Sequence, residues 1–240
     1  MKTVQDIKKL LGRKIAPCES WHEMDKRLRE QDAKDQFKRF SKQFTDHKIN
    51  KSMGRCGLTG KHLQCTFDNY IVTNPDQQKA LDFSRYYAEN FRYLKKINYV
   101  FFGHSRTGKN HLSAAICNFL TNQGISCLVI TVTELMLKIK SSYRKDSKVS
   151  EEQILKEVCA FDFLVIDEIG VHHASENTKV LLNYIIDQRS INSRHTGILS
   201  NLNASDLRRE LGDRSLNRIM ELGTGIKFLW DQYTFDGDEL

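Results

Sequence analysis

The sequence predicts an α/β fold in which helices cover both faces of a five-stranded parallel sheet. The first observation is a set of short runs rich in β-branched and aromatic residues, at 98–102, 126–132, 161–167, 196–200 and 226–230. The second is that stretches with helical apolar spacing separate them, at roughly 109–122, 133–144, 151–159, 176–190 and 204–221. Strict alternation of strands and helices is typical of a parallel sheet, and 240 residues leave room for a second, smaller unit.

The composition is that of a folded globular protein, with 40% hydrophobic and 28% charged residues. No apolar run approaches the ~20 residues that span a bilayer, and the first residues are too charged for a secretory signal. The six cysteines are scattered and do not form a small disulfide framework. We therefore expect a cytoplasmic protein with reduced cysteines and no membrane contact.

Positive charge is concentrated at the N-terminus. Residues 1–62 carry 16 Lys and Arg against 8 Asp and Glu, which leaves 21 against 22 for residues 63–240. A basic appendage on a near-neutral domain suits a nucleic acid or an acidic protein partner, although a charged helix face can also be merely solvated. We predict a small basic helical domain with its linker at 1–62 and the α/β domain at 63–240.

Residues 19–48 contain neither Pro nor Gly and are predicted to form one long amphipathic helix or two. Trp21, Met24 and Leu28 follow helical spacing, as do the phenylalanines at positions 37, 40 and 44. Because its other faces are highly charged, this narrow apolar stripe must dock either on the following domain or on another protein.

A linker is predicted at 49–65, where three glycines and several cations accompany few apolar residues. Cys56, His62 and Cys65 have side chains that can bind a metal, but their spacing lacks the paired C-x2-C of common zinc sites. The sequence leaves a metal at this place open.

The segment Gly103-His104-Ser105-Arg106-Thr107-Gly108-Lys109-Asn110 follows the first strand and opens a helix. It matches the P-loop pattern G-x4-G-K-[ST] at every fixed position except the last. Its glycines let backbone N–H groups face phosphate oxygens, and Lys109 supplies a cation for the β- and γ-phosphates. We predict that ATP binds through Gly103, His104, Ser105, Arg106, Thr107, Gly108, Lys109, Asn110 and His111.

Two acids follow the third strand, which delivers them to the same sheet edge as the P-loop. Asp167 is predicted to hold Mg²⁺ together with the amide oxygen of Asn110, which replaces the usual hydroxyl ligand. Glu168 is predicted to polarise the attacking water, and Asn201, after the fourth strand, to orient it.

With these elements in place, the chain resembles the DnaC-type bacterial helicase loaders, AAA+ ATPases that are close to the IstB-type helper ATPases. The most specific segments are CTFDNY (65–70), TGKNHLSAAICN (107–118), VITVTELM (129–136), SEEQILKEV (150–158), FLVIDEIG (163–170) and TGILSNLN (196–203). The resemblance implies that Asn201 is the sensor-1 residue and that Arg218, one turn after Arg214, is the arginine finger that reaches a neighbouring subunit. It also implies a loader-specific insert at about 133–158 that lines a DNA-facing groove.

The family further implies a weak ATPase that is coupled to helicase loading. Its N-terminal helices would grip a hexameric DnaB-like replicative helicase, and its copies would form an open ring or spiral on the helicase and on single-stranded DNA. The chain departs from the family pattern at Ser105 and Arg106, which replace Pro-Gly, and in having no arginine after Tyr233. Two alternatives remain: an IstB-like transposition helper, and a hydrolysis-deficient protein that only binds the helicase.

Overall fold

The structure is a computed structural model that describes Leu58 and residues 60–144, 146–170 and 175–231. All of them belong to one compact unit, Asp46–Leu240. The predicted N-terminal helix, Cys56 and Tyr233 lie outside the described residues. The domain boundary after residue 62 therefore stays a prediction.

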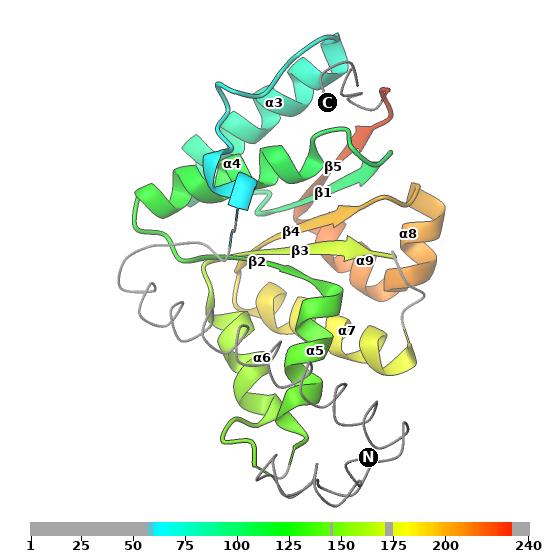
Figure 1. The fold of residues 1–240 in the computed structure, drawn as a ribbon. Coiled ribbons are helices and arrows are strands. Elements are labelled where there is room, and N and C mark those ends of the chain that lie inside the picture. Colours follow the sequence, from blue (N-terminus) through cyan, green and yellow to red (C-terminus); the bar gives the residue numbers. More distant parts are fainter. Residues whose placement is uncertain (1–57, 59, 145, 171–174, 232–240) are drawn as a thin grey trace, which may run out of the picture. The chain divides into compact units, whose positions relative to one another are not determined.

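The centre of the unit is a parallel sheet with strand order β2-β3-β4-β1-β5 (Figure 1). Its strands are β1 (Asn98–Gly103), β2 (Cys127–Thr131), β3 (Phe163–Ile169), β4 (His195–Ser200) and β5 (Gly223–Phe228). β4 lies between β1 and β3 and pairs with both, so the P-loop strand and the strand that carries Asp167 are not neighbours in the sheet. In such sheets ligands bind at the carboxyl ends of the strands, so this order predicts where the site lies.

Helices form a layer on each face of the sheet (Figure 1). One layer holds α3 (Pro75–Glu89) and α4 (Lys109–Asn122), and the other holds α5 (Val132–Ser142), α6 (Glu151–Ala160), α7 (Glu176–Ile191), α8 (Ala204–Leu211) and α9 (Asp213–Glu221). Two short 3-10 helices, η1 (Gly60–Gln64) and η2 (Phe91–Tyr93), flank α3. Alternate strand residues fill two separate cores: Tyr99 and Phe101 pack toward α3 and α4, and Val100 packs toward the opposite layer.

Local sequence signals define most helix starts. Capping boxes begin α3 at Asn74, α5 at Thr131 and α6 at Ser150, and in each box the residue three positions later returns the hydrogen bond. The predicted ranges for the four helices from 109 to 191 agree with the observed ones within two residues, and side-chain caps fix the starts of three of them, α5, α6 and α7.

Two sequence expectations need correction, and one helix was not predicted. The single helix expected at 204–221 is two helices, because Gly212 takes a positive φ of 77°, which favours glycine, and ends α8. β5 begins at Gly223 and ends at Phe228, so Trp230 lies beyond the strand in which it was expected. The helix α3 carried no prediction at all. Among the described residues, no helix is long and apolar enough to span a membrane.

Candidate nucleotide-binding site

The loop at 103–110 connects β1 to α4, and both of its glycines are required by close neighbours. Gly103 has φ 125°, and a Cβ atom there would lie 2.4 Å from the carbonyl oxygen of Phe228. Gly108 has φ 92°, and a Cβ atom there would lie 2.6 Å from the ring of Tyr70. Any other residue would clash at either position, so the loop conformation depends on glycine.

The first turn of α4 has backbone N–H groups that no side chain caps. Its N-cap is Gly108, whereas α3, α5, α6, α7 and α8 each begin with a side chain that accepts hydrogen bonds from the first turn. Uncapped N–H groups at the positive end of a helix dipole bind anions, phosphate above all. The local geometry thus fits the phosphate-binding role that the motif predicts.

Lys109 lies beneath this loop and is 4% exposed. Its Nζ donates to the carbonyl oxygens of Gly103, at 3.0 Å, and of His104. Burial lowers the pKa of Lys109 to about 8, and nearby Asp167 partly opposes this shift. A buried ammonium group at the loop gains electrostatic stabilisation from any phosphate that enters.

The other predicted loop residues fall into two groups. His104, Ser105 and Arg106 are exposed, whereas Thr107 is buried and its hydroxyl donates to the His104 carbonyl at 2.7 Å. His111 lies apart from the loop apex: its Nε2 is 3.0 Å from the carbonyl oxygen of Thr66. The structure thus directs His111 toward the segment that precedes α3.

Two aromatic side chains hold the loop from outside, and sequence reasoning missed both. The indole Nε1 of Trp230 donates to the Thr107 carbonyl at 3.0 Å, and the Tyr70 hydroxyl donates to the same oxygen at 3.4 Å. Tyr70 precedes α3 and Trp230 follows β5, so only the folded chain brings them to Thr107. No local pattern in the sequence could reveal these contacts.

The two predicted metal ligands meet at the sheet edge. The Nδ2 of Asn110 donates to Oδ2 of Asp167 at 2.5 Å, while the backbone N–H of Glu168 donates to Oδ1 at 2.6 Å. Burial raises the pKa of the Asp167 carboxyl group, which is 8% exposed. A desolvated carboxylate beside the amide group of Asn110 offers hard oxygen donors, and the pair therefore fits Mg²⁺.

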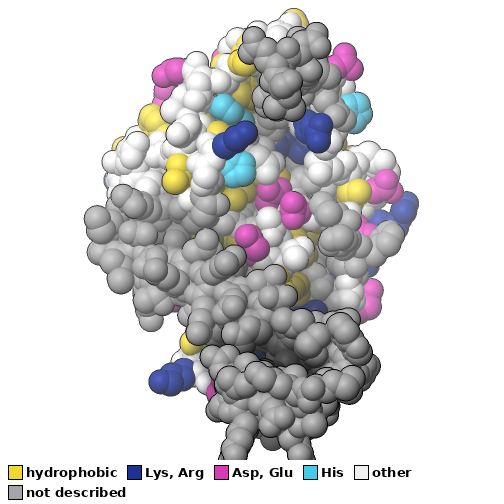
Figure 2. Space-filling view, in the orientation of Figure 1, with side chains coloured by type: hydrophobic (Ala, Val, Ile, Leu, Met, Phe, Trp, Pro, Cys, Tyr) yellow, Lys and Arg dark blue, Asp and Glu magenta, His cyan; other side chains and the backbone are white. Residues whose placement is uncertain are grey.

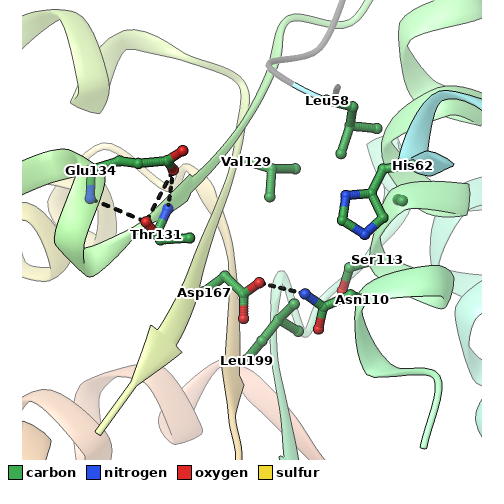
Figure 3. A pocket seen from close by; sticks show the side chains of 10 residues that line it. Leu58, His62, Asn110, Ser113, Val129, Thr131, Glu134, Asp167 and Leu199 are labelled. Carbon is green, nitrogen blue, oxygen red and sulfur yellow. Dashed lines mark hydrogen bonds between the residues drawn. The ribbon is translucent and has the colours of Figure 1, made fainter. Parts of the chain in front are cut away.

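A cavity of about 170 Å³ adjoins this pair (Figure 3). Its polar walls include His62, Thr131 and Glu134, and its apolar wall includes Leu58 and Leu199. His62 and Leu58 belong to the chain segment that precedes α3 and face Asn110 and Asp167 across the cavity in Figure 3. Their approach to the site depends on tertiary packing, because Asn118 of α4 donates to the carbonyl oxygens of His62 and Cys65.

Glu168 is exposed and turns away from this cavity. It lies in a bulge of β3, where the pairing with β4 shifts between Ile166 and Ile169, and its φ is 61°. Its side chain lines a separate cavity of about 30 Å³ together with Thr133 and Glu210. Figure 2 shows acidic side chains gathered in the middle of the visible face, with basic and histidine side chains beside them. The structure therefore brings Glu168 to the predicted edge, but its side chain lines a different cavity from the one that Asp167 lines.

Asn201 and Arg218 also stand apart from the cavity. Asn201 follows β4 at the same sheet edge and is exposed. On α9, Arg218 Nη1 lies 2.6 Å from Oδ1 of Asp187, and Arg214 Nη2 lies 2.8 Å from Oδ2 of the same carboxylate. Asp187 of α7, which sequence reasoning did not select, thus engages both arginines.

The cysteine and histidine residues of the linker do not converge on a metal site in the described part of the chain. Cys65 is buried in the core, its thiol donates to the Lys61 carbonyl, and burial raises its pKa. His62 instead lines the cavity beside Asp167. Among the described residues, no three His, Cys, Asp or Glu side chains form a metal-binding group.

The matches to known proteins agree with this geometry. The family model of the IstB-like ATP-binding proteins matches residues 66–221. The replicative helicase loader DnaC of Escherichia coli K12 is 42% identical over 188 residues, which cover 78% of this chain and 76% of DnaC. The chain belongs to this DnaC family of IstB-like ATP-binding proteins. The family resemblance expected from the sequence is confirmed, and with it the AAA+ fold.

Solved structures support the same fold. A crystal structure of the DnaC helicase loader superposes with a TM-score of 0.63 at 24% identity, over 71% of this chain and 99% of that one. The AMPPCP-bound DnaA of Aquifex aeolicus superposes with a TM-score of 0.60 at 19% identity, over 70% of this chain and 51% of that one. At these identities the superpositions show the fold alone, and this DnaC-family chain shares that fold with a protein that binds an ATP analogue.

Proposed function

We propose that the chain is an ATP-dependent loader that binds a hexameric replicative helicase of the DnaB type and places it on single-stranded DNA. The helicase is proposed because relatives at this level of identity are named replicative helicase loaders. One observation supports the dependence on ATP. Lys109 and the uncapped N-terminus of α4 lie at the same sheet edge as the Asn110–Asp167 pair.

In this proposal the loop amides and Lys109 bind the phosphates, and Lys109 exchanges its loop carbonyl partners for phosphate oxygens. Asp167 and the amide oxygen of Asn110 hold Mg²⁺, which when bound neutralises phosphate charge. Glu168 polarises the attacking water, and Asn201 orients it. Because Glu168 lines the neighbouring cavity, its carboxylate must turn toward the phosphates before it can act as a base.

Arg218 is proposed to complete the site of an adjoining copy in a ring or spiral on the helicase. Its guanidinium group is paired with Asp187 and is 31% exposed. A planar guanidinium group keeps donors free when one nitrogen is paired, so Arg218 can bind a phosphate on a neighbour while Asp187 fixes its position.

Two substitutions test the nucleotide site. Lys109→Ala removes the buried cation, and we expect ATP binding to be lost in a titration with a fluorescent nucleotide. Glu168→Gln keeps the volume and removes the base, so ATP binding should persist while single-turnover hydrolysis slows by about 100-fold or more. ATP affinity unchanged by Lys109→Ala would refute the site, and simultaneous loss of both activities in Glu168→Gln would show a structural role for that residue.

The position of Glu168 also favours a second candidate, a helicase-binding protein that hydrolyses no ATP. The two candidates differ in one measurement, phosphate release in the presence of Mg²⁺, single-stranded DNA and the captured helicase. Release that depends on Glu168 supports the loader. A transposition helper, which the IstB-like family also allows, would instead form filaments on duplex DNA and capture no replicative helicase.

A further inference from the structure

The segment that joins α3 to β1 presents one aromatic ring to solvent. Phe91 and Leu94 anchor the segment: Phe91 is buried and stacks on His195 with ring centres 3.8 Å apart, and Leu94 packs against the same core. Between these anchors Tyr93 is 84% exposed, the largest exposed fraction among the large hydrophobic side chains of the described residues. Such a ring offers a face to another planar group.

Three cations lie within three residues of Tyr93 in the sequence. Arg92, Lys95 and Lys96 are exposed, and within the described residues none of them forms an ion pair. By contrast, three cations on α7 and α8 each pair with a nearby carboxylate, namely Lys179, Arg208 and Arg209. Because residues 63–240 are nearly neutral, the positive charge beside Tyr93 is a local feature.

A cleft of about 520 Å³ adjoins the same segment. Arg92 lies on one wall, and Asn192, Ser193 and Arg194 lie on another, where Arg194 is paired with Asp162. These residues precede β1, β3 and β4, so the cleft lies at the amino ends of the strands, opposite the edge that carries the P-loop. A volume of this size is in the range that accommodates a nucleotide-sized group.

We propose that Arg92, Tyr93, Lys95 and Lys96, together with this cleft, form a contact for single-stranded nucleic acid, named here the amino-edge patch. Single strands are bound by cations that follow the phosphates and by aromatic rings on which unpaired bases stack. In a duplex the bases are stacked on one another, so an isolated ring would gain little. An acidic peptide would satisfy the cations but would leave the exposed ring without a planar partner.

The inference rests on the proposed function for its ligand, single-stranded DNA, and adds a contact site separate from the insert at 133–158. The full-length protein with ATP and Mg²⁺ is titrated with fluorescently labelled oligothymidylate while anisotropy is followed. Tyr93→Ala should weaken binding by about 10-fold, which is about 1.4 kcal/mol at 25 °C, whereas Tyr93→Phe, which keeps the ring, should bind like the parent. Replacing Arg92, Lys95 and Lys96 by Gln should reduce the slope of log K against log salt by about 2, because each lost phosphate contact contributes about 0.7.

The matched control replaces Lys179, Arg208 and Arg209 by Gln, which changes the net charge equally at a distant surface. Nucleotide titration and helicase capture are measured on every variant, so failure of the patch and failure of the proposed function give different results. The inference is overturned if the control weakens binding as much as the patch variant, if the parent protein binds no oligothymidylate while it still captures the helicase, or if the patch variant loses only the helicase. A selective loss of oligothymidylate binding supports it.

Discussion

Arg106 occupies a backbone conformation that ordinarily belongs to glycine. Its φ is 56°, in the left-handed region where a Cβ atom costs about 1 kcal/mol or more. The residue lies at the exposed apex of the P-loop, where the related loaders are expected to have glycine. The strain is therefore local, and it is removable without disturbing the buried part of the loop.

We predict that Arg106→Gly raises the stability of the ATPase domain by about 1 kcal/mol, which corresponds to roughly 2–4 °C in Tm. The matched control is Arg106→Ala, which removes the same charge and keeps the Cβ atom. Differential scanning calorimetry should show a higher Tm for the glycine variant alone. Equal shifts for both variants would assign the effect to charge and not to backbone strain.

His195 gives the start of β4 a dependence on pH. Its ring stacks on Phe91, its Nδ1 lies 3.1 Å from the Tyr87 hydroxyl, and it is close to Arg189 and Asp162. Burial, and then the charge of Arg189, lower the pKa of His195 to about 4, which the carboxylate of Asp162 partly opposes. The folded state therefore holds this ring neutral.

The pKa of His195 is lower in the folded state than in the unfolded chain. The contribution of the neutral ring to folding stability is therefore fully present above about pH 6.5, and it is lost as the pH falls through 6.5 toward 4. We predict that the free energy of unfolding falls as the pH is lowered from 6.5 to 4.5. The slope of this free energy against pH should include the uptake of up to one proton by His195 on unfolding. His195→Gln should lack this part of the slope in urea denaturation at several pH values. Parallel curves for the two proteins would contradict the assignment.

At the scale of the assembly, Arg218 should act in trans, since α9 presents it at the surface beside Asp187. We predict that Arg218→Ala leaves ATP binding by single protomers intact and abolishes DNA-stimulated turnover. Mixing Arg218→Ala with Glu168→Gln protein should restore part of the turnover, because some interfaces then contain both intact groups. Arg214→Ala, on the same helix and paired with the same carboxylate, is the control. Absence of recovery at every mixing ratio would argue against a role in trans.

The helicase contact is predicted to lie in the N-terminal arm, outside the described residues. Replacing Trp21, Leu28 and Phe37 by Ala should reduce helicase capture by orders of magnitude, because buried anchors at an interface each contribute about 1–4 kcal/mol. Thermal unfolding of the ATPase domain should hardly change. A lower melting temperature with helicase capture retained would show instead that the stripe belongs to the core of the protein.

The sequence by itself determined the alternating elements, the P-loop and the edge at which Asp167 meets it. Those features depend on short stretches of sequence, because strand composition, capping residues and the glycines at 103 and 108 each act over only a few positions. Parallel order then places the carboxyl ends of β1 and β3 at one edge without further information.

Only the tertiary structure decided which distant side chains complete the site. Tyr70 and Trp230 reach the Thr107 carbonyl, His62 faces the cavity beside Asp167, and Asp187 holds the two arginines of α9. The bulge that turns Glu168 toward another cavity also depends on the pairing of β3 with β4. Such contacts join residues that are far apart in the chain, and their partners are selected by packing, which no local pattern encodes.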